Sequence, residues 1–181
     1  MNDPDILKIN EGIARKFRKI EEDLALCRTA VELFESLLTG IGGEFAIPFV
    51  WLSVIRRPEA AGLLKDLEES KILRDRLNII DEEAFLAVVP KATPPLLANG
   101  DLRPFFRLLP VNRKYFIRSL AVSPLALHGR PIGSLNHGDA SPDRYQPGMD
   151  TTLLGRLAGK VSEHLSRLLP PEQESIAGKE G

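Results

Sequence analysis

Apolar residues recur at spacings that alternate between four and three along the first 38 positions of the chain. No proline occurs between positions 6 and 38, and Gly12 is the only glycine there. The pattern predicts one helix from Ile6 to Leu38 with a heptad seam along one side. The seam consists of Ile13, Phe17, Ile20, Leu24, Cys27, Val31, Phe34 and Leu38.

Charged residues flank this seam with signs that suit a parallel homodimer. In a parallel, in-register pair, Lys16 would face Glu21 of the second helix, and Asp23 would face Arg28. Exposed ion pairs contribute only about 0.2–1 kcal/mol each, but opposite signs favour this register. We therefore predict that residues 1–40 form a dimerisation helix through which two copies associate in parallel.

The alternative is an amphipathic helix that packs only on its own domain. A second apolar stripe supports a contact of this kind for the C-terminal half of the helix. That stripe consists of Leu26, Ala30, Leu33 and Leu37. A helix with two apolar faces is compatible with both roles, one face for a partner and one for the domain.

After a glycine-rich run from Thr39 to Gly43, which predicts the end of the helix, the apolar positions take the spacing of strands. The segment from Phe45 to Ile55 is apolar on both alternations, which is typical of a strand covered on both faces. The next predicted elements are a helix from Glu59 to Arg74, a short strand from Leu77 to Ile80, and a helix that Asp81 caps and that carries Ala84 to Val89.

The segment from Lys91 to Val111 is rich in proline and predicts a long irregular connection, a kind of loop that often carries function. Two strands joined by a short turn at His128–Arg130 follow as a predicted hairpin, the first of them within Tyr115–Leu127. A leucine-faced helix that Asp150 caps ends at Pro170. We expect residues 41–170 to form one domain and residues 171–181 to be a disordered tail.

Composition narrows the class of protein. Apolar residues make up 43% and charged residues 27%, and the net charge is −1, which excludes a strongly basic nucleic-acid-binding surface. No apolar run approaches the length that spans a membrane, and the N-terminus lacks the features of a signal peptide. The single cysteine, Cys27, excludes an internal disulfide. We expect a cytoplasmic protein that binds neither nucleic acid nor membrane.

The stretch GRPIGSLNHGD contains Ser134, His137 and Asp139, the residue types of a hydrolytic triad. Side chains alternate between the two faces of a strand, so Ser134 and His137, three residues apart, point in opposite directions. The stretch also lacks the GxSxG pattern of a nucleophile elbow. We predict a strand that ends in a turn, with His137 at the mouth of a pocket, and no catalytic or metal site.

A cluster of cations suggests where a ligand would bind. Between Leu102 and Gly138 there are six cations and no acid. One interpretation is a solvated surface whose acids lie elsewhere in space. The other is a pocket that recognises an anion, since guanidinium groups bind carboxylates and phosphates in a bidentate way. The predicted ligand-binding residues are Trp51, Arg107, Tyr115, Arg118 and His137, with Phe106 as a further stacking candidate.

The C-terminal third resembles a GAF-like family of bacterial proteins of unknown function. The resemblance rests on Arg118-Ser119, Pro124-Leu125, Gly129, Gly133-Ser134-Leu135, Gly138, Asp143-Arg144-Tyr145, Pro147-Gly148-Met149 and Thr151, followed by the leucine-faced helix. It implies an α+β fold: a central antiparallel sheet with the first and last helices packed on one face. The segment from Lys91 to Arg113 would cover the other face and enclose a ligand pocket.

The resemblance also implies a function. GAF domains are usually dimeric sensory modules for small molecules, cyclic nucleotides or chromophores. This chain shows no cyclic-nucleotide-binding pattern, and the predicted domain has no cysteine to attach a bilin or to support a GAF-type sulfoxide reductase. We expect a dimeric sensory or regulatory module that binds a small molecule, an anion being favoured, and signals to a partner in trans. The alternative is a protein-interaction scaffold with a vestigial pocket, and a hydrolase or reductase is disfavoured.

Overall fold

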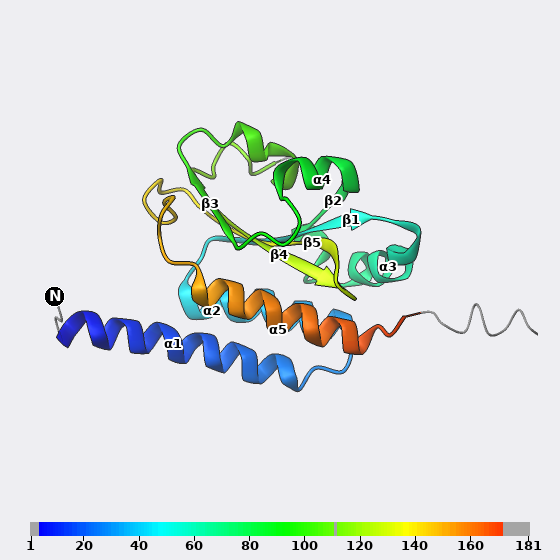
Figure 1. Ribbon diagram of the computed structural model, residues 1–181, viewed down its shortest axis with the longest axis horizontal. Helices are drawn as coiled ribbons and strands as arrows, with labels where there is room; N and C mark the ends of the chain where they lie inside the picture. The colour runs from blue at the N-terminus through cyan, green and yellow to red at the C-terminus, as the bar shows by residue number, and fades with distance from the viewer. Residues whose placement is uncertain (1–3, 111, 172–181) are drawn as a thin grey trace, which may run out of the picture.

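In the computed structural model, residues 4–110 and 112–171 are described, and they form a five-stranded sheet between two layers of other structure (Figure 1). The strand order is β2-β1-β5-β4-β3. The strands are β1 (Phe49–Arg56), β2 (Leu77–Asp81), β3 (Leu96–Asn99), β4 (Ser119–Leu127) and β5 (Arg130–Asp139). This arrangement confirms the predicted α+β fold class.

One pair of strands departs from the expected antiparallel sheet. β1 and β2 are parallel, whereas the pairs β1–β5, β4–β5 and β3–β4 are antiparallel. The chain returns from the end of β1 through a short 3-10 turn, the helix α3 (Ala61–Glu69) and a second 3-10 turn before it enters β2. A crossover of this kind is what joins parallel neighbours, and the sheet is therefore mixed.

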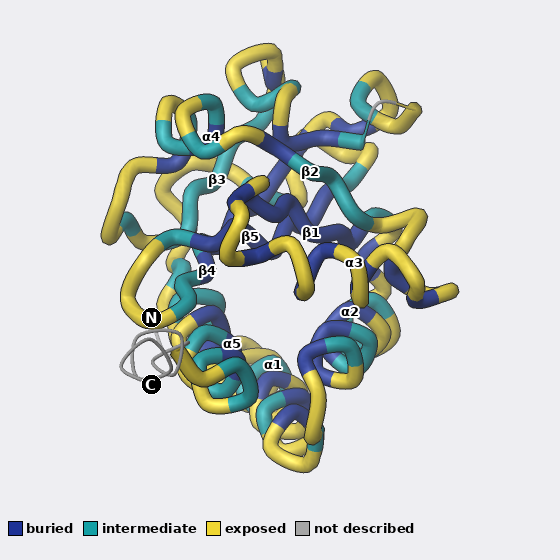
Figure 2. The backbone as a smooth tube through the Cα atoms, turned by 90° about the vertical axis from the view of Figure 1, so that its right-hand side faces the viewer, coloured by how far each residue is buried: buried dark blue, intermediate teal, exposed yellow. Residues whose placement is uncertain are grey.

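Helices cover one face of the sheet, and shorter segments cover the other (Figures 1 and 2). The helical layer contains α1 (Pro4–Ala25), α2 (Ala30–Phe45) and α5 (Thr152–Leu168). The opposite face carries α4 (Glu82–Val88) and the 3-10 segment η3 (Arg103–Leu108). Each face has its own core of buried apolar side chains, so the sheet is covered on both sides. No helix within the described residues is long and apolar enough to cross a membrane.

The long N-terminal helix is present, but it does not extend to Leu38. α1 ends at Ala25, and a new helix begins after Thr29. The Thr29 hydroxyl accepts a hydrogen bond from the backbone N–H of Glu32 (3.1 Å) and donates to the Glu32 carboxylate (3.1 Å). This pairing of threonine with a glutamate three residues later resembles a capping box, which marks the start of a helix. The prediction of one helix over 6–38 is therefore wrong.

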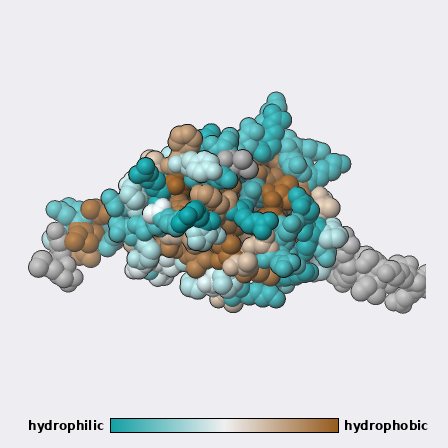
Figure 3. Space-filling model, turned by 90° about the horizontal axis from the view of Figure 1, so that it is seen from above, coloured by the Kyte–Doolittle hydropathy of each residue, from teal (hydrophilic) through white to brown (hydrophobic). Residues whose placement is uncertain are grey.

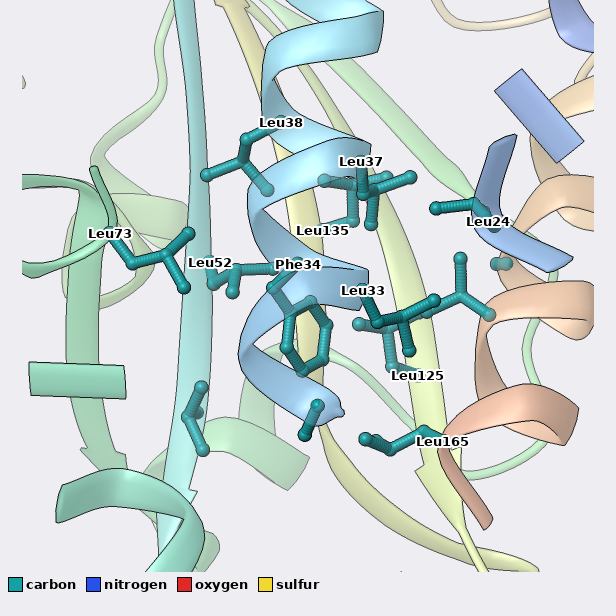
Figure 4. Close-up of a cluster of buried hydrophobic side chains, with 14 of the residues drawn as sticks. Leu24, Leu33, Phe34, Leu37, Leu38, Leu52, Leu73, Leu125, Leu135 and Leu165 are labelled. Carbon is teal, nitrogen blue, oxygen red and sulfur yellow. The ribbon is translucent and has the colours of Figure 1, made fainter. Parts of the chain in front are cut away.

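The predicted seam residues lie largely inside this chain. α1 and α2 form an antiparallel hairpin, in which the Phe17 and Phe45 rings are 4.9 Å apart. Figure 4 shows Leu24 of α1, several leucines of α2 and Leu165 of α5 around the same cluster. The buried seam residues are Phe17, Ile20, Leu24, Phe34 and Leu38; those partly buried against the same core are Ile13, Cys27 and Val31.

The glycine-rich run from Gly40 to Gly43 continues the helix instead of ending it. α2 extends to Phe45, and Ala46, in the left-handed conformation (φ 51°), terminates it. A Cβ on Gly40 would lie 3.4 Å from a side-chain carbon of Ile20, so the glycine allows α1 and α2 to approach closely. As a result the first strand begins at Phe49, four residues later than predicted.

The hairpin and the last helix agree with the sequence. His128 (φ 52°) and Gly129 (φ 78°) form the two-residue turn between β4 and β5, which is typical of hairpins. The cap position of α5 is Thr151, and the neighbouring Asp150 carboxylate accepts from the backbone N–H and the hydroxyl of Thr152. The predicted disordered tail, residues 171–181, lies outside the described residues from position 172 onward.

Candidate functional site

The five predicted ligand-binding residues do not meet in one pocket. His137 pairs with Val50 on the face of the sheet that the helices cover, whereas Trp51 and its partner Asn136 belong to the opposite face. Arg107 is exposed on η3. Tyr115 and Arg118 are exposed in the segment that leads into β4. The structure therefore divides the predicted site between the two faces of the sheet.

η3 covers the Trp51 side chain, which is 2% exposed. Trp51 also lines a hollow of about 600 Å³ between the C-terminal half of α2, the start of β1 and the 3-10 turn before β2. The Trp51 indole N–H donates to the backbone carbonyl oxygen of Leu108 (2.7 Å), and the Ser53 hydroxyl donates to the same oxygen (2.9 Å). The Asn78 side-chain amide donates to the carbonyl oxygen of Arg107 (2.8 Å). These bonds attach η3 to the sheet at the place where we expected a ligand.

A buried polar network within β1 and β5 fixes the position of Ser53, one of the two donors to Leu108. The Asn136 amide donates to the Ser53 hydroxyl (3.0 Å), and the Ser134 hydroxyl donates to the Asn136 amide oxygen (2.9 Å). All three side chains are inaccessible to solvent. Buried polar groups that satisfy one another in this way fix a single arrangement. The network also confirms that Ser134 and His137 lie on opposite faces of β5 and cannot bond to each other.

Four of the six predicted cations lie on a largely exposed surface, which we call the basic–aromatic patch, whereas Arg103 pairs with Asp101 and Arg130 pairs with Glu59 and Glu82. The patch consists of Arg107, Arg113, Lys114, Tyr115, Phe116 and Arg118. Lys114 Nζ lies 5.3 Å from the ring centre of Phe106 and 5.4 Å from that of Tyr115. Arg107 lines a shallow hollow of about 310 Å³, and Arg118 lines another of about 380 Å³. The space-filling view toward this side of the sheet shows hydrophilic and hydrophobic groups interleaved (Figure 3).

A different hollow lies on the helical side of the sheet, and we call it the His137 cleft. Its volume is about 290 Å³, and it lies between β5, β3, α1, the end of α2, the start of α5 and the loop after β5. Its apolar lining consists of Ile13, Phe17, Phe45, Ile47, Leu97, Met149, Leu153 and Leu154, and its polar lining of His137, Arg144, Tyr145 and Asp150.

His137 and Tyr145 are the unusual members of this lining. The His137 side chain is 3% exposed, and its Nε2 atom has no hydrogen-bond partner among the described residues. Burial and, to a lesser extent, the charge of Arg144 lower the pKa of His137 to about 4, so the ring is neutral at pH 7. The Tyr145 ring centre lies 6.0 Å from that of His137.

The Tyr145 hydroxyl is also buried, and no described residue reaches it with hydrogen-bond geometry. Burial raises the pKa of Tyr145 to about 12, against the opposing effect of Arg144. The guanidinium of Arg144 lies over the Tyr145 ring, with its central carbon 5.9 Å from the ring centre, and it donates to the carbonyl oxygen of Phe45 (2.7 Å) and to the Asp139 carboxylate (3.3 Å). The cleft therefore combines apolar walls with two neutral polar groups for which the described residues supply no well-aligned hydrogen bond.

Other reactive side chains show no comparable arrangement. Within residues 4–110 and 112–171, no group of three or more histidine, cysteine or acidic side chains could hold a metal ion. Cys27 lies between α1 and α2, and burial raises the pKa of its thiol. Cys27 is partly buried against the apolar core of the helical layer, where a cysteine packs as a small apolar side chain.

Sequence reasoning placed His137 at a pocket but did not find Tyr145, Arg144 or the Ser53–Asn136 pair. Strand alternation could have grouped Ser134 with Asn136, since they are two residues apart on β5. The approach of Tyr145 to His137 depends on the turn that the chain makes after Asp139, which no local pattern reveals.

No protein-family model matches this chain, and no curated protein matches it significantly. Solved structures do. A free methionine-R-sulfoxide reductase from Neisseria meningitidis aligns over 83% of this chain and 87% of its own, with a TM-score of 0.57 and 18% identity. The GAF domain of an Acinetobacter phosphoenolpyruvate-protein phosphotransferase aligns over 92% and 95%, with a TM-score of 0.56 and 11% identity.

The photosensory core module of a Stigmatella aurantiaca phytochrome also aligns with this chain, with a TM-score of 0.55 and 14% identity. The alignment includes 99% of this chain but only 41% of the phytochrome module. At these identities the likeness concerns the fold alone. The architecture and these neighbours together show that the chain has the fold of GAF domains.

Proposed function

We propose that this protein is a sensory or regulatory module of the GAF type, which binds a small molecule in the His137 cleft and signals to a partner in trans. The observation that carries the proposal is the position of the cleft. Its walls include Ile13 and Phe17 of α1, Leu153 and Leu154 of α5, and His137 of the sheet. A molecule in the cleft would contact both helices and the sheet at once.

Such a contact offers a route for the signal. α1 and α5 pack against each other beneath the sheet (Figure 1), and Arg156 of α5 forms an ion pair with Glu21 of α1 (3.4 Å). A ligand that favours one packing of these helices shifts the equilibrium by its difference in affinity for the two arrangements. The cleft is therefore placed to couple binding to the position of α1.

The first turns of α1 carry the proposed homodimer contact. They extend past the edge of the sheet (Figure 1), and Ile6, Leu7 and Ile9 are each more than half exposed. These residues continue the apolar side of α1 that is buried further along the helix. We propose that two copies of this cytoplasmic protein pair in parallel through these turns, so that the seam between chains is shorter than the heptad pattern predicted.

The reductase among the structural neighbours does not lead us to propose that activity. A thiol reductase needs an accessible, activated cysteine. The single cysteine, Cys27, is in the connection between α1 and α2, and burial raises its pKa. Binding rather than catalysis is the function that this chain's residues support.

The experiment is a thermal-shift screen of metabolite and nucleotide libraries, followed by distance measurements on a hit. A ligand at 100 times its dissociation constant should add about 2.7 kcal/mol to the free energy of unfolding. Spin labels at exposed positions on α1 (Lys8→Cys) and α5 (Arg167→Cys), in a Cys27→Ser background, report the helix packing.

A hit that changes the label-to-label distance distribution supports the proposal. A library without hits, or hits that leave the distances unchanged, would contradict it. Diluting labelled protein with unlabelled protein keeps the measurement within one chain when two copies associate.

The basic–aromatic patch supports a second candidate, a scaffold that binds an acidic protein segment. Tyr115 is 76% exposed and Phe116 is 65% exposed, and none of the four cations around them has an ion pair with another described residue. A labelled glutamate-rich peptide tests this function by fluorescence anisotropy. The double charge reversal Lys114→Glu/Arg118→Glu should weaken its binding at least tenfold, and unchanged binding would refute the candidate.

A further inference from the structure

We propose that the His137 cleft takes a neutral amphipathic molecule, with one uncharged head that both donates and accepts a hydrogen bond, such as a carboxamide, on an apolar body. The inference rests on the proposed function and defines the ligand class of that same site. Three properties of the cleft support it: its two polar groups that find no partner among the described residues, its compensated charges and its size.

The polar groups define the head of the molecule. His137 Nε2 and the Tyr145 hydroxyl are both buried and both without a partner among the described residues. Buried polar groups are nearly always hydrogen-bonded in folded proteins, so two adjacent exceptions in one hollow are an informative pair. The phenol donates one hydrogen bond and accepts others, while a neutral imidazole nitrogen does one or the other according to its tautomer. A head with both a donor and an acceptor can satisfy the two groups in either tautomer.

The surrounding charges favour an uncharged head. Arg144 is the cation whose charge acts on both His137 and Tyr145, and its guanidinium already donates to Asp139 and to the carbonyl oxygen of Phe45. Asp150 places a carboxylate in the lining. A carboxylate ligand would therefore meet the charge of Asp150, while the cation in the described lining, Arg144, is already paired with Asp139. An ammonium ligand would lie near Arg144 and would lose its own hydration, since the walls are apolar.

The walls and the volume define the body of the molecule. Eight of the twelve lining side chains are apolar, and they come from α1, the end of α2, β3 and α5. With about 30 Å³ for each water-sized group, a cleft of about 290 Å³ holds about ten non-hydrogen atoms. A single aromatic ring with a carboxamide has this size.

Benzamide, benzoate and benzylamine are matched probes of this chemistry, because they share a ring and differ in the charge of the head. We would titrate each probe into the full chain at pH 7 and follow the ring signals of His137 and Tyr145 and the methyl signal of Met149 by NMR. Benzamide should shift all three sets of signals and bind at least tenfold more tightly than either charged probe. The proposal is overturned if a charged probe binds as tightly as benzamide, or if benzamide at 20 mM leaves these signals unchanged.

Two variants separate a binding role from a structural one. His137→Leu removes a buried polar group that has no partner among the described residues, so it should raise the melting temperature of the unliganded protein by about 3 °C. It should also weaken the binding of benzamide at least tenfold. Ser123→Ala is the control, because the Ser123 hydroxyl is also buried with no partner in the described part of the chain but does not line the cleft. Ser123→Ala should also raise the melting temperature, and it should leave the affinity for benzamide unchanged.

Each remaining outcome has a defined meaning. Retained benzamide affinity in His137→Leu, or an equal loss in Ser123→Ala, would overturn the assignment of the ligand to this cleft. A library compound that stabilises the protein while all three probes leave the His137 signals unmoved would refute this ligand class and leave the sensory function standing. A library without any hit would refute the sensory function itself.

Discussion

Lowering the pH should destabilise this protein through His137. Burial and the neighbouring Arg144 lower the pKa of His137 from 6.5 to about 4 in the folded chain. Between these two values the unfolded chain binds a proton that the folded chain does not, so the free energy of unfolding falls as the pH falls. A difference of about 2.5 pKa units corresponds to about 3 kcal/mol between pH 7 and pH 4. That is a large part of the roughly 5–15 kcal/mol that stabilises a typical domain.

Urea unfolding followed by circular dichroism, at half-unit steps from pH 4.5 to 7.5, measures this slope. The hydrogen bonds that Thr152 donates lower the pKa of Asp150, the carboxylate in the lining of the cleft, so this group keeps its charge in the folded chain across the window. His137→Leu should remove most of the slope. His128→Asn should retain it, since His128 is an exposed turn residue with φ 52°, a conformation that asparagine tolerates. Equal slopes in the wild-type protein and His137→Leu would refute the assignment of the slope to His137.

Three further substitutions test the packing that surrounds the two faces of the sheet. Leu38→Ala should lower the free energy of unfolding in urea by about 2–5 kcal/mol at every protein concentration, because this side chain is fully buried within one chain. A loss that depends on protein concentration would instead indicate a seam between chains. Gly133→Ala should lower the free energy of thermal unfolding by about 3 kcal/mol or more, since the added Cβ would lie 2.0 Å from the carbonyl oxygen of Ser53. A nearly unchanged free energy would contradict this geometry. Trp51→Phe removes the hydrogen bond to Leu108, so it should lower the free energy of unfolding by about 0.5–1.5 kcal/mol and accelerate amide hydrogen exchange in η3. An unchanged exchange rate would show that the bond does not hold this segment.

The sequence predicted the sheet and the last helix better than the first helix. The alternation along β5 and the turn at His128-Gly129 depend on neighbouring residues, and both were correct. β3 was missed, because Leu96–Asn99 lies in the segment predicted to be irregular. The heptad pattern from Ile13 to Leu38 was real, but such a pattern shows only that a helix packs on another helix. It does not show whether the second helix belongs to the same chain. The pairing of Thr29 with Glu32 was a local signal for the break between α1 and α2.

The candidate site was predictable only where it depends on strand geometry. Alternation correctly separated Ser134 from His137. The positions of Arg107 and Arg118 depend on how the irregular segment folds back, and that is decided by contacts far apart in the sequence. The carbonyl oxygen of Leu108, which bonds to Trp51, is a backbone atom that any residue type could supply. Residue identity therefore carried little information about this contact.

The hydrogen bonds to Leu108 hold a segment of the same chain, η3, on the face of the sheet opposite the helices. Because Trp51 and Ser53 both donate to this carbonyl oxygen, the segment Arg103–Leu108 acts as a tethered competitor whose local concentration does not fall on dilution. A free molecule that binds these two donors must displace the segment first. Its apparent affinity is then its intrinsic affinity multiplied by the fraction of molecules in which the segment has left the sheet. A substitution that loosens the segment therefore strengthens binding on this face without adding any contact to the bound molecule.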